Sequence, residues 1–443
     1  MQIIMGLTKN YLFMKFDNCI FILVFFLMNC SSSPEITEDP VKEHSNAKPN
    51  ILLIIADDVS KDAVPNYTEG IIKANMPNLQ GLMSTGITFD NVWAYPVCSP
   101  TRASIITGKY GFKTGVLTVD DPISLSETSL QQSITNYTNN AYATAIIGKW
   151  HLSKNTSDPL TFGVNYFAGI LNGGISNYLN WPLVENGTSS ISSEYATTKL
   201  TDLAINWLGS QTKPWFLWMA YNAPHTPFHL APTKLHSQGS LATDTTSINE
   251  NPLPYYLSAL EAIDTEMGRL FNSLTVKERE NTIIIFIGDN GSPNKVAQTP
   301  YKRTTVKGSL YQGGINVPMV VSGKGVDRLG AREPGLINST DLFTTIGNIA
   351  GIQVKEIENS ISFYDTFIDT NATRRNYVYS EKEDAYSVRD TTYKYIKFEN
   401  GREELYNLST DAYEKVNLMN NTLTTEASEA KLALIVEADR IRS

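Results

Sequence analysis

Five apolar runs of strand length constrain the fold of this chain more than any other feature. Each is rich in aliphatic or aromatic residues and lacks alternation with polar residues, which is typical of strands buried on both faces of a sheet. Segments with helical periodicity lie between them, for example residues 195–208 and 254–274. Strands that alternate with helices predict a mostly parallel sheet with helices on both sides. The five runs are residues 50–58, 142–151, 214–225, 282–291 and 317–323.

Four of these runs end in polar side chains that can take part in chemistry. The carboxyl ends of parallel strands meet at one edge of a sheet, and such sheets bind their ligands there. We therefore expect these side chains to lie close together in the fold. They are Asp57, Asp58, Lys149, His151, His225, Asp289 and Asn290.

The oxygen-bearing members of this set predict a metal site. Paired carboxylates at a strand end repel one another unless a cation joins them. Asp57, Asp58, Asp289 and Asn290 offer only oxygen ligands, which favour Ca²⁺ or Mg²⁺ over zinc. Taken singly, an Asp-Asp pair is also typical of a helix cap, and Asp-Asn-Gly of a turn. Their combination on two strands of one sheet favours the metal site.

Lysine and histidine follow the remaining strands. Lys149 and His151 lie beyond one strand and His225 beyond another. Lysine can hold an anion, and histidine can move a proton near neutral pH. Lys307 precedes the last apolar run and could reach the same pocket, although on its own it is typical of a solvated lysine. We expect His229 and His236 to be solvent-exposed loop residues.

The segment "CSPTRASIITG" predicts a helix that begins close to Cys98. Ser99 is typical of an N-cap, Pro100 of the first helical position, and Gly108 of a helix end. The free N–H groups and the dipole of a helix N-terminus attract an anion. Arg102, one turn into the helix, is expected to point toward the same place.

The N-terminal residues resemble a bacterial lipoprotein signal. The apolar run at residues 19–28 is too short for a membrane span and leads to Cys30, which a polar stretch follows. We expect a signal peptide over residues 1–30, a polar tether over 31–48, and an exported periplasmic or cell-surface protein that contacts the membrane only through lipid on Cys30. A plain secretory signal is the alternative. With the other two cysteines in this leader, Cys98 has no disulfide partner.

The pattern changes near residue 353. Alternation of Tyr, Val and Ile with polar residues predicts a small antiparallel sheet with a hairpin at residues 399–401, closed by a terminal helix. We therefore expect a main domain over residues 49–355 and a C-terminal subdomain over 356–443. The Ser-rich and Thr-rich stretch 186–193 is expected to be a loop. The net charge of −9 argues against a nucleic-acid partner, although a local cluster of Lys and Arg can still attract an anionic substrate.

Several motifs together resemble the formylglycine-dependent sulfatases of the alkaline phosphatase-like superfamily. "CSPTR" resembles the family's C-x-P-x-R signature, "NILLIIADD" its first metal strand, and "GDNG" its second. "GKWHL" is similar to its Lys-x-His segment, "APHTPF" to its His loop, "KGSLYQGGINVP" to its lysine segment, and "EELYNLSTDAYEKVNL" to its ending. The resemblance runs in order from about residue 49 to 418. It implies the family's α/β fold, a large mostly parallel or mixed sheet sandwiched by helices, with a small C-terminal subdomain.

The resemblance also implies a cofactor and a modified residue. In that family a dedicated maturation enzyme oxidises the cysteine to formylglycine (3-oxoalanine), and the hydrated aldehyde is the nucleophile. One Ca²⁺ ion would be held by the formylglycine at position 98 together with Asp57, Asp58, Asp289 and Asn290.

Carried over to this chain, the catalytic roles are distinct. Arg102 would steady the formylglycine, and Lys149 and Lys307 would bind sulfate oxygens. His225 would protonate the leaving alcohol. His151 would deprotonate the second hydroxyl of the hydrated aldehyde, which then expels sulfate and restores the aldehyde, a step that a plain Ser or Cys cannot perform.

Two positions depart from the family pattern. Gln312 stands where the family usually has Glu, and Asn316 where it usually has Arg. Both lie outside the core catalytic set, so they bear on the substrate more than on the reaction. Lys302 and Arg303 are candidate contacts to a second anionic group of the substrate, and a solvated basic loop is the equal alternative.

The resemblance implies a sulfatase that acts on a sulfated carbohydrate, either a polysaccharide or its oligosaccharides. We favour an algal polymer such as ulvan as the example, and carrageenan, fucoidan and animal glycosaminoglycans are the alternatives. A phosphoesterase or phosphonate hydrolase of the same superfamily is an alternative. A second alternative is an inactive sugar-binding relative, which would lack a ligand or the nucleophile, and none of these is missing here.

Overall fold

The computed structural model describes residues 48–443, which belong to one compact unit. The predicted signal peptide, the lipid site at Cys30 and the tether up to residue 47 lie outside the described residues. Across residues 48–443, no helix has the length and apolar character that a membrane crossing requires.

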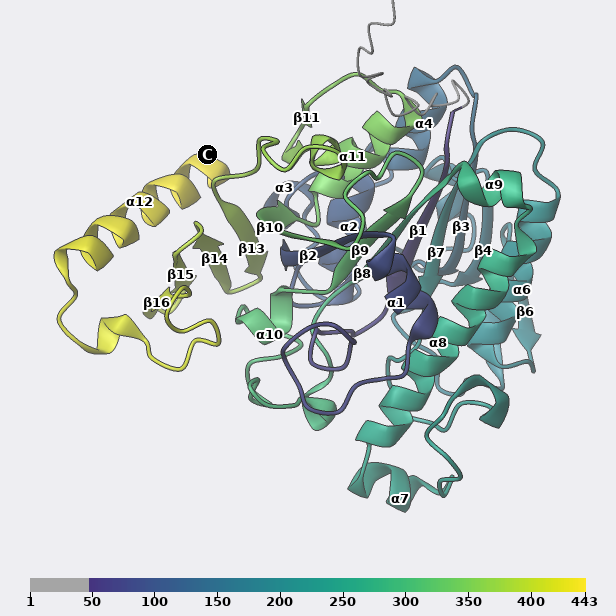
Figure 1. The fold of residues 1–443 in the computed structure, drawn as a ribbon, viewed down its shortest axis with the longest axis horizontal. Coiled ribbons are helices and arrows are strands. Elements are labelled where there is room, and N and C mark those ends of the chain that lie inside the picture. The colour runs from purple at the N-terminus through teal and green to yellow at the C-terminus, as the bar shows by residue number, and fades with distance from the viewer. Residues whose placement is uncertain (1–47) are drawn as a thin grey trace, which may run out of the picture. The chain divides into compact units, whose positions relative to one another are not determined.

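A ten-stranded mixed sheet forms the larger part of the fold (Figure 1). In order across the sheet, the strands are β10 (Ala331–Asn338), β2 (Gly86–Trp93), β9 (Met319–Gly323), β8 (Thr282–Gly288), β1 (Asn50–Ala56), β7 (Trp215–Tyr221), β3 (Ala143–Lys149), β4 (Tyr166–Ile170), β5 (Trp181–Glu185) and β6 (Thr188–Ser192). β1 pairs in parallel with β7 and β8, and β3 pairs in parallel with β7. The predicted mostly parallel or mixed sheet is confirmed.

Helices cover both faces of this sheet. Along β1, Leu52 and Ile54 belong to one hydrophobic core, whereas Ile51, Leu53 and Ile55 belong to the other, and all five are fully buried. This burial on both sides explains why the run shows no polar alternation. The first core is closed by α1 (Pro77–Ser84), α6 (Ala196–Gly209) and α8 (Leu253–Ser273), and the second by α2 (Cys98–Thr107), α4 (Leu130–Tyr137) and α11 (Asp341–Ala350).

The antiparallel strand β9 begins at the edge of the sheet where β1 and β8 end. Its first residue, Met319, pairs with Ile287 near the end of β8. The chain that leads into β9 therefore arrives at the edge where the parallel strands stop. Lys307 lies in that segment and so reaches the same edge from the opposite chain direction.

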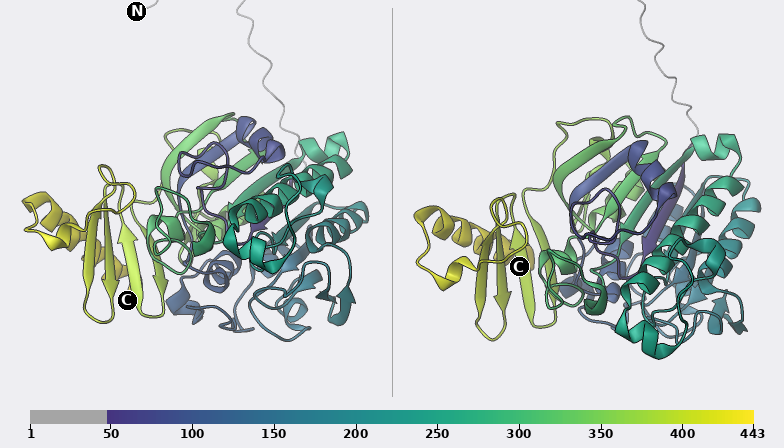
Figure 2. Two further views of the ribbon diagram at one scale, coloured as in Figure 1. Left: turned by 90° about the horizontal axis from the view of Figure 1, so that it is seen from below. Right: turned by 60° about the horizontal axis from the view of Figure 1, so that its bottom comes forward.

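The C-terminal residues form a four-stranded antiparallel sheet with a helix packed on one face (Figure 2). Residues 399–401 form the turn between its last two strands, and Gly401 adopts the positive φ of 87° that this turn requires. The sheet, hairpin and terminal helix agree with the sequence prediction. The elements are β13 (Val378–Lys382), β14 (Ala385–Arg389), β15 (Tyr393–Phe398), β16 (Glu403–Asn407) and α12 (Thr425–Arg442).

The expectation of a loop at residues 186–193 was wrong. Most of this segment forms β6, which pairs with β5 through a hairpin. The strand lies at the end of the sheet and most of its side chains are exposed, so Ser and Thr face water there. A polar edge strand of this kind lacks the apolar run that identifies the central strands.

Shorter elements connect these parts. The helices are α3 (Gly111–Thr114), α5 (Asp158–Thr161), α7 (Thr245–Glu250), α9 (Val276–Glu280) and α10 (Gln312–Ile315), with short 3₁₀ turns at Thr233–Leu235, Asn294–Val296, Tyr364–Phe367 and Leu418–Asn420. A small hairpin, β11 (Glu356–Ile357) and β12 (Ser360–Ile361), packs against α11.

A buried ion pair ties the segment before β13 to the main sheet. Asp341, the first residue of α11, accepts hydrogen bonds from Arg375 Nε at 2.7 Å and from the backbone N–H groups of Asn338 and Ile361, both at 2.8 Å. The Asp341 side chain is 1% exposed and that of Arg375 is 10% exposed. Removing the arginine would leave a carboxylate in the interior without its counter-charge.

We expect Arg375→Met to lower the free energy of unfolding by about 3 kcal/mol, because one partner of a buried pair is lost while the other stays buried. Urea denaturation followed by circular dichroism measures the change. Arg440→Met is the matched control, since Arg440 makes an exposed pair with Glu437 on α12 and should cost less than about 1 kcal/mol. Equal losses in the two variants would contradict the proposed importance of the Arg375 pair.

Candidate active site at the sheet edge

The side chains that the sequence predicts to converge do so at one edge of the ten-stranded sheet. Four of the predicted residues, Cys98, His151, His225 and Lys307, line a cavity of about 480 Å³ at this edge. Asp57 and Asp58 follow β1, Lys149 and His151 lie at the end of β3, His225 follows β7, Asp289 and Asn290 follow β8, and Cys98 and Arg102 lie in the first turns of α2.

The oxygen-bearing side chains form one buried cluster. Asp58 donates its backbone N–H to Asp289 Oδ1 at 3.0 Å, and Asn290 Nδ2 donates to Asp58 Oδ1 at 2.7 Å. Ligand atoms of Asp57, Cys98 and Asp289 lie within 4.8 Å of one another. Burial raises the pKa of Asp57 well above its usual value, and the neighbouring carboxylates add to this, although Lys149 opposes it.

This cluster fits a hard divalent cation. Asp57 Oδ1 and Asn290 Oδ1 are buried and have no hydrogen-bond partner among residues 48–443. Buried polar atoms are normally paired, so two unsatisfied oxygens in one all-oxygen set point to a ligand. Calcium prefers such oxygen donors, from carboxylates and amides alike.

Three cations lie against the three carboxylates. Lys149 Nζ is 2.6 Å from Asp57 Oδ2, Arg102 Nη2 is 2.7 Å from Asp289 Oδ2, and Lys307 Nζ is 2.6 Å from Asp58 Oδ1. Arg102 Nη1 also donates to the backbone carbonyl of Lys149 at 2.8 Å, which links α2 to β3. The carboxylates thus hold the cations in place at the base of the cavity.

Cys98 is the first residue of α2, so the helix begins two residues earlier than predicted. Val97 occupies the N-cap position with extended backbone, and the Ser99 hydroxyl does not cap the helix but accepts the backbone N–H of Asp120 at 3.2 Å. Gly108 ends the helix in the left-handed conformation, as predicted. Burial raises the pKa of the Cys98 thiol to about 11. The unmodified thiol is therefore protonated at neutral pH and is a poor nucleophile.

His151 is held by a carboxylate that sequence reasoning missed. Its Nε2 lies 2.8 Å from Asp120 Oδ1, while its Nδ1 is buried without a partner in the described part of the chain. Burial lowers the pKa of His151 to about 3, with the charge of Lys149 adding to this effect. Because the carboxylate accepts, the neutral ring carries its proton on Nε2 and leaves Nδ1 as the free base.

His225 is oriented by the backbone. Its Nδ1 lies 2.8 Å from the carbonyl oxygen of Thr226, and its Nε2 lies 3.7 Å from Asp58 Oδ2. A carbonyl only accepts, so Nδ1 carries the proton of the neutral ring and Nε2 is the nitrogen that can gain and lose one. Burial lowers the pKa of His225 to about 4.

Two glycines allow the chain to pass close to both imidazoles. A Cβ atom at Gly173 would lie 2.4 Å from the His151 ring, and one at Gly174 would lie 3.2 Å from the His225 ring. The segment between β4 and β5 therefore contacts the site through its backbone. The dipeptide Gly-Gly is the only sequence signal that could have drawn attention to this segment.

Asp120, Lys154 and Asn172 line the mouth of the cavity and were not predicted. They come from loops without a strand or a motif to identify them. The Lys154 side chain is 70% exposed and lies 3.9 Å from Asp120, so its charge faces solvent above the buried cluster.

Other predicted positions lie elsewhere. Lys302 and Arg303 are exposed and do not line the cavity around Cys98, and their role as substrate contacts stays a prediction. The expectation that His229 is solvent-exposed was wrong. Its ring stacks on Tyr178 at a centroid distance of 3.8 Å, and its Nε2 lies 2.9 Å from the hydroxyl of Tyr195. Tyr178, between β4 and β5, and Tyr195, at the N-cap of α6, thus partly bury it.

Comparison with known proteins gives one consistent result. Residues 49–352 match the family model described as Sulfatase. The uncharacterized sulfatase YdeN of Escherichia coli (strain K12) is 29% identical over 378 residues, which cover 71% of this chain and 65% of that protein. Arylsulfatase J of Mus musculus is 27% identical over 336 residues, which cover 70% of this chain and 54% of that protein. The chain thus spans less than two thirds of the length of these two relatives.

Further similarities concern proteins whose descriptions name a carbohydrate. The ulvan-active sulfatase of Formosa agariphila is 24% identical over 357 residues, covering 76% of this chain and 67% of that protein. Among solved structures, Ps i-CgsB in complex with k-i-k-neocarrahexaose superimposes with a TM-score of 0.74 at 25% identity, over 89% of this chain and 92% of that one.

We expect Ca²⁺ to stabilise the protein through this cluster, by about 2.7 kcal/mol when its concentration is 100 times the dissociation constant. Asp289→Asn should remove most of this increment, because the variant loses a carboxylate from the ligand set. Unfolding midpoints with excess Ca²⁺ and with chelator measure the increment for each protein against its own metal-free state. Asp369→Asn, at an exposed aspartate, should keep the full increment. A full increment in Asp289→Asn would exclude the cluster as the calcium site.

Proposed function

This chain belongs to the sulfatase family, and we propose that it hydrolyses sulfate esters of a sulfated carbohydrate. The observation that carries the proposal is the cavity in which Cys98, two histidines and Lys307 meet above the buried carboxylates. A sulfate ester needs its oxygens neutralised, a nucleophile at sulfur and a proton for the leaving alcohol. The side chains around this cavity can meet each need.

We propose that Asp57, Asp58, Asp289 and Asn290 hold Ca²⁺, and that Cys98 is converted to formylglycine by a maturation enzyme. When bound, the ion offsets the charge of the sulfate oxygens. The hydrated aldehyde supplies the hydroxyl nucleophile, a role for which the protonated thiol is unsuited. The position of Cys98 within 4.8 Å of carboxylate oxygens supports its membership of the ligand set.

Lysine and arginine side chains would bind and orient. Lys149 is fully buried and held by Asp57, so its ammonium group is positioned before substrate arrives. Lys307 lines the cavity and is only partly buried, so it can turn toward a sulfate oxygen. Arg102 bonds both Asp289 and the carbonyl of Lys149, which fixes the start of α2 and steadies position 98.

The two histidines would move protons at different atoms. His225 faces the cavity with Nε2, because Nδ1 is engaged by the Thr226 carbonyl. The ring is neutral without substrate, but the negative charge of a bound sulfate would favour its protonated form. The protonated Nε2 can then donate to the leaving alcohol. His151 offers Nδ1 as a base, because Asp120 engages Nε2. Asp120 is therefore a positioning residue for His151.

A carbohydrate substrate is supported by the relatives. One is described as ulvan-active, and a similar structure holds a neocarrahexaose. We propose a sulfated polysaccharide or its oligosaccharides, with an algal polymer such as ulvan as the favoured example. Lys154 and Asn172 at the mouth of the cavity are placed to contact the sugar, and Lys302 and Arg303 stay candidate contacts to a second anionic group.

We also propose that the protein is exported and anchored by lipid on Cys30, from the signal-like residues that precede the described structure. The proposed division is a sulfatase domain over residues 49–355 and a C-terminal subdomain over 356–443.

Mass spectrometry of the peptide that contains residue 98 tests the nucleophile. After expression with the maturation enzyme, we expect the mass change that accompanies conversion of a cysteine to formylglycine, and activity in proportion to the converted fraction. Expression without that enzyme should leave the thiol and little activity. Full activity in a protein whose Cys98 is entirely a thiol would contradict the mechanism. Parallel assays with sulfate and phosphate esters separate a sulfatase from a phosphoesterase of the same superfamily.

We expect His225→Ala to lower kcat for sugar sulfates by about 10² to 10⁴-fold, because a sugar alkoxide leaves poorly without a proton. The loss for activated aryl sulfates should be about tenfold or less, since their leaving groups are stable as anions. Steady-state kinetics with both substrate types measures the ratio. His236→Ala, outside the cavity, should affect neither. Equal losses on both substrate types would exclude His225 as the general acid.

A further inference from the structure

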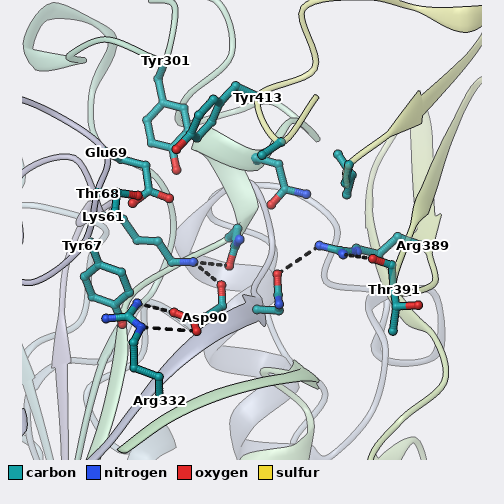
Figure 3. A pocket seen from close by; sticks show the side chains of 15 residues that line it. Lys61, Tyr67, Thr68, Glu69, Asp90, Tyr301, Arg332, Arg389, Thr391 and Tyr413 are labelled. Atoms are coloured by element: carbon teal, nitrogen blue, oxygen red, sulfur yellow. Dashed lines mark hydrogen bonds and ion pairs between the residues drawn. The ribbon is translucent and has the colours of Figure 1, made fainter. Parts of the chain in front are cut away.

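A second cavity, of about 350 Å³, lies between the main sheet and the edge of the C-terminal sheet (Figure 3). Its walls come from the loop after β1, from β2, from α10 and from the chain that follows β14. It shares no lining residue with the cavity around Cys98. It is therefore a polar cavity that is separate from the candidate active site.

Lys61 is a buried cation that neutral oxygens hold in this cavity. Its side chain is 2% exposed, and its Nζ donates to the carbonyl of Asp90 and to Asn316 Oδ1, the latter at 2.8 Å. Within residues 48–443, no carboxylate oxygen lies within 4.0 Å of Nζ. Burial lowers the pKa of Lys61 to about 8. Among the described residues its Nζ has no third oxygen or nitrogen acceptor, and the ring of Tyr67 lies on one side with its centroid 5.3 Å away.

Arg389 is a second cation without a carboxylate. It is 5% exposed, and its three hydrogen bonds go to neutral acceptors: the Asp390 carbonyl at 2.7 Å, Asn91 Oδ1 at 3.2 Å and the Thr391 carbonyl at 3.1 Å. Burial lowers the pKa of Arg389 to about 10. Figure 3 shows Lys61 and Arg389 approaching the cavity from opposite sides.

The two cations are attached to adjacent residues of β2. Lys61 bonds the carbonyl of Asp90, and Arg389 bonds the side chain of the next residue, Asn91. The third cation of the lining, Arg332, differs from both because it pairs with the Asp90 carboxylate. Arg332 thus has a carboxylate in direct contact. Across residues 48–443, Lys61 and Arg389 have none within 4.0 Å, and Glu69 or Glu414 acts on them only from a longer distance.

A buried amide adds an independent sign of a ligand. Gln312 is 3% exposed and lines the cavity, and its Nε2 has no hydrogen-bond partner in the described chain. A buried donor without an acceptor costs free energy, so its presence beside two unpaired cations points to an acceptor that is not part of the protein. Gln312 and Asn316 are also the two positions that depart from the family pattern. Asn316 here accepts a bond from Lys61, so a cation is still present at this place.

Acidic residues do not cancel this charge. The lining carries three cations and two carboxylates, Asp90 and Glu69, which leave a net charge of +1. Asp90 is occupied by Arg332, and Glu69 makes no ion pair with Lys or Arg within residues 48–443. Tyr301 and Tyr413 pack edge to face at a centroid distance of 6.0 Å and form an aromatic wall. The remaining donors converge on a space of suitable size for a small anion or a sugar that carries one.

We propose that this cavity binds a small oxyanion, a sulfate or carboxylate group, between Lys61, Arg389 and Gln312. All three line the cavity and carry N–H donors, and an oxyanion can accept from several such donors at once. The anion is either a free ion or a group carried by a sugar chain.

Selenate, a tetrahedral analogue of sulfate, locates the site directly by anomalous diffraction from soaked crystals of the protein. We expect a peak between Lys61 and Arg389. Arg389→Gln should lose that peak, because one of two charged partners is gone. Arg402→Gln, at an exposed arginine of the same subdomain, should keep it. In solution, a thermal-shift titration with sulfate at constant ionic strength measures the affinity. Both proteins carry Lys307→Met, which weakens sulfate binding at the cavity around Cys98. Arg389→Gln should then bind sulfate about tenfold or more weakly than its parent.

A second experiment addresses an anion that arrives only on a sugar, and it rests on the proposed function. Arg389→Gln should then raise KM for an anionic oligosaccharide several-fold more than KM for a small aryl sulfate, while Arg402→Gln raises neither. Selenate binding assigns the site to free anions, and a selective rise in KM without selenate assigns it to the sugar. Absence of both effects overturns the proposal. Because selenate binding needs no catalysis, its outcome is independent of whether the protein is a sulfatase.

Discussion

Three carboxylates forced together in the protein interior are the constraint on which the rest of this structure depends. Asp57, Asp58 and Asp289 come from two adjacent parallel strands and are completely buried. Like charges at such distances are tolerated only when counter-charges share the same low-dielectric space. The pairing of β1 with β8 brings the acids together, and the helix α2, the strand β3 and the segment before β9 each deliver one cation to them. The arrangement of the sheet and the charge of the site therefore depend on each other.

The sequence predicts the central sheet and its polar edge well, because both follow from local rules. An unbroken apolar run identifies a strand buried on two faces, and parallel strands end at one edge. The partner of His151 could not be predicted in this way, since Asp120 lies 31 residues earlier in a loop without periodicity. The packing of His229 between two tyrosines depends on contacts between loops for the same reason. The start of α2 differs from the prediction because the Ser99 hydroxyl accepts a hydrogen bond from another loop and does not cap its own helix.

The two cavities treat positive charge in opposite ways. At the edge of the sheet, each cation lies within 3 Å of a carboxylate, so its position is set before any ligand arrives. Beside the C-terminal sheet, Lys61 and Arg389 are held by carbonyl and amide oxygens, which fix their geometry but leave their charge. The first arrangement can accommodate a divalent cation together with an anion, whereas the second favours an anion alone. The two polar cavities thus differ in whether a carboxylate contacts their buried cations.

The glycine pair beside the two imidazoles limits how a chain like this can diversify. No side chain can be added at Gly173 without moving the ring of His151, so this stretch cannot acquire new contacts by substitution. Variation in what the cavity accepts is expected instead from other lining residues in loops, such as Lys154, whose side chain is largely exposed. Descendants of this sequence would keep the inner wall constant, and a change in what the cavity accepts would arise in the loops and not in the strands.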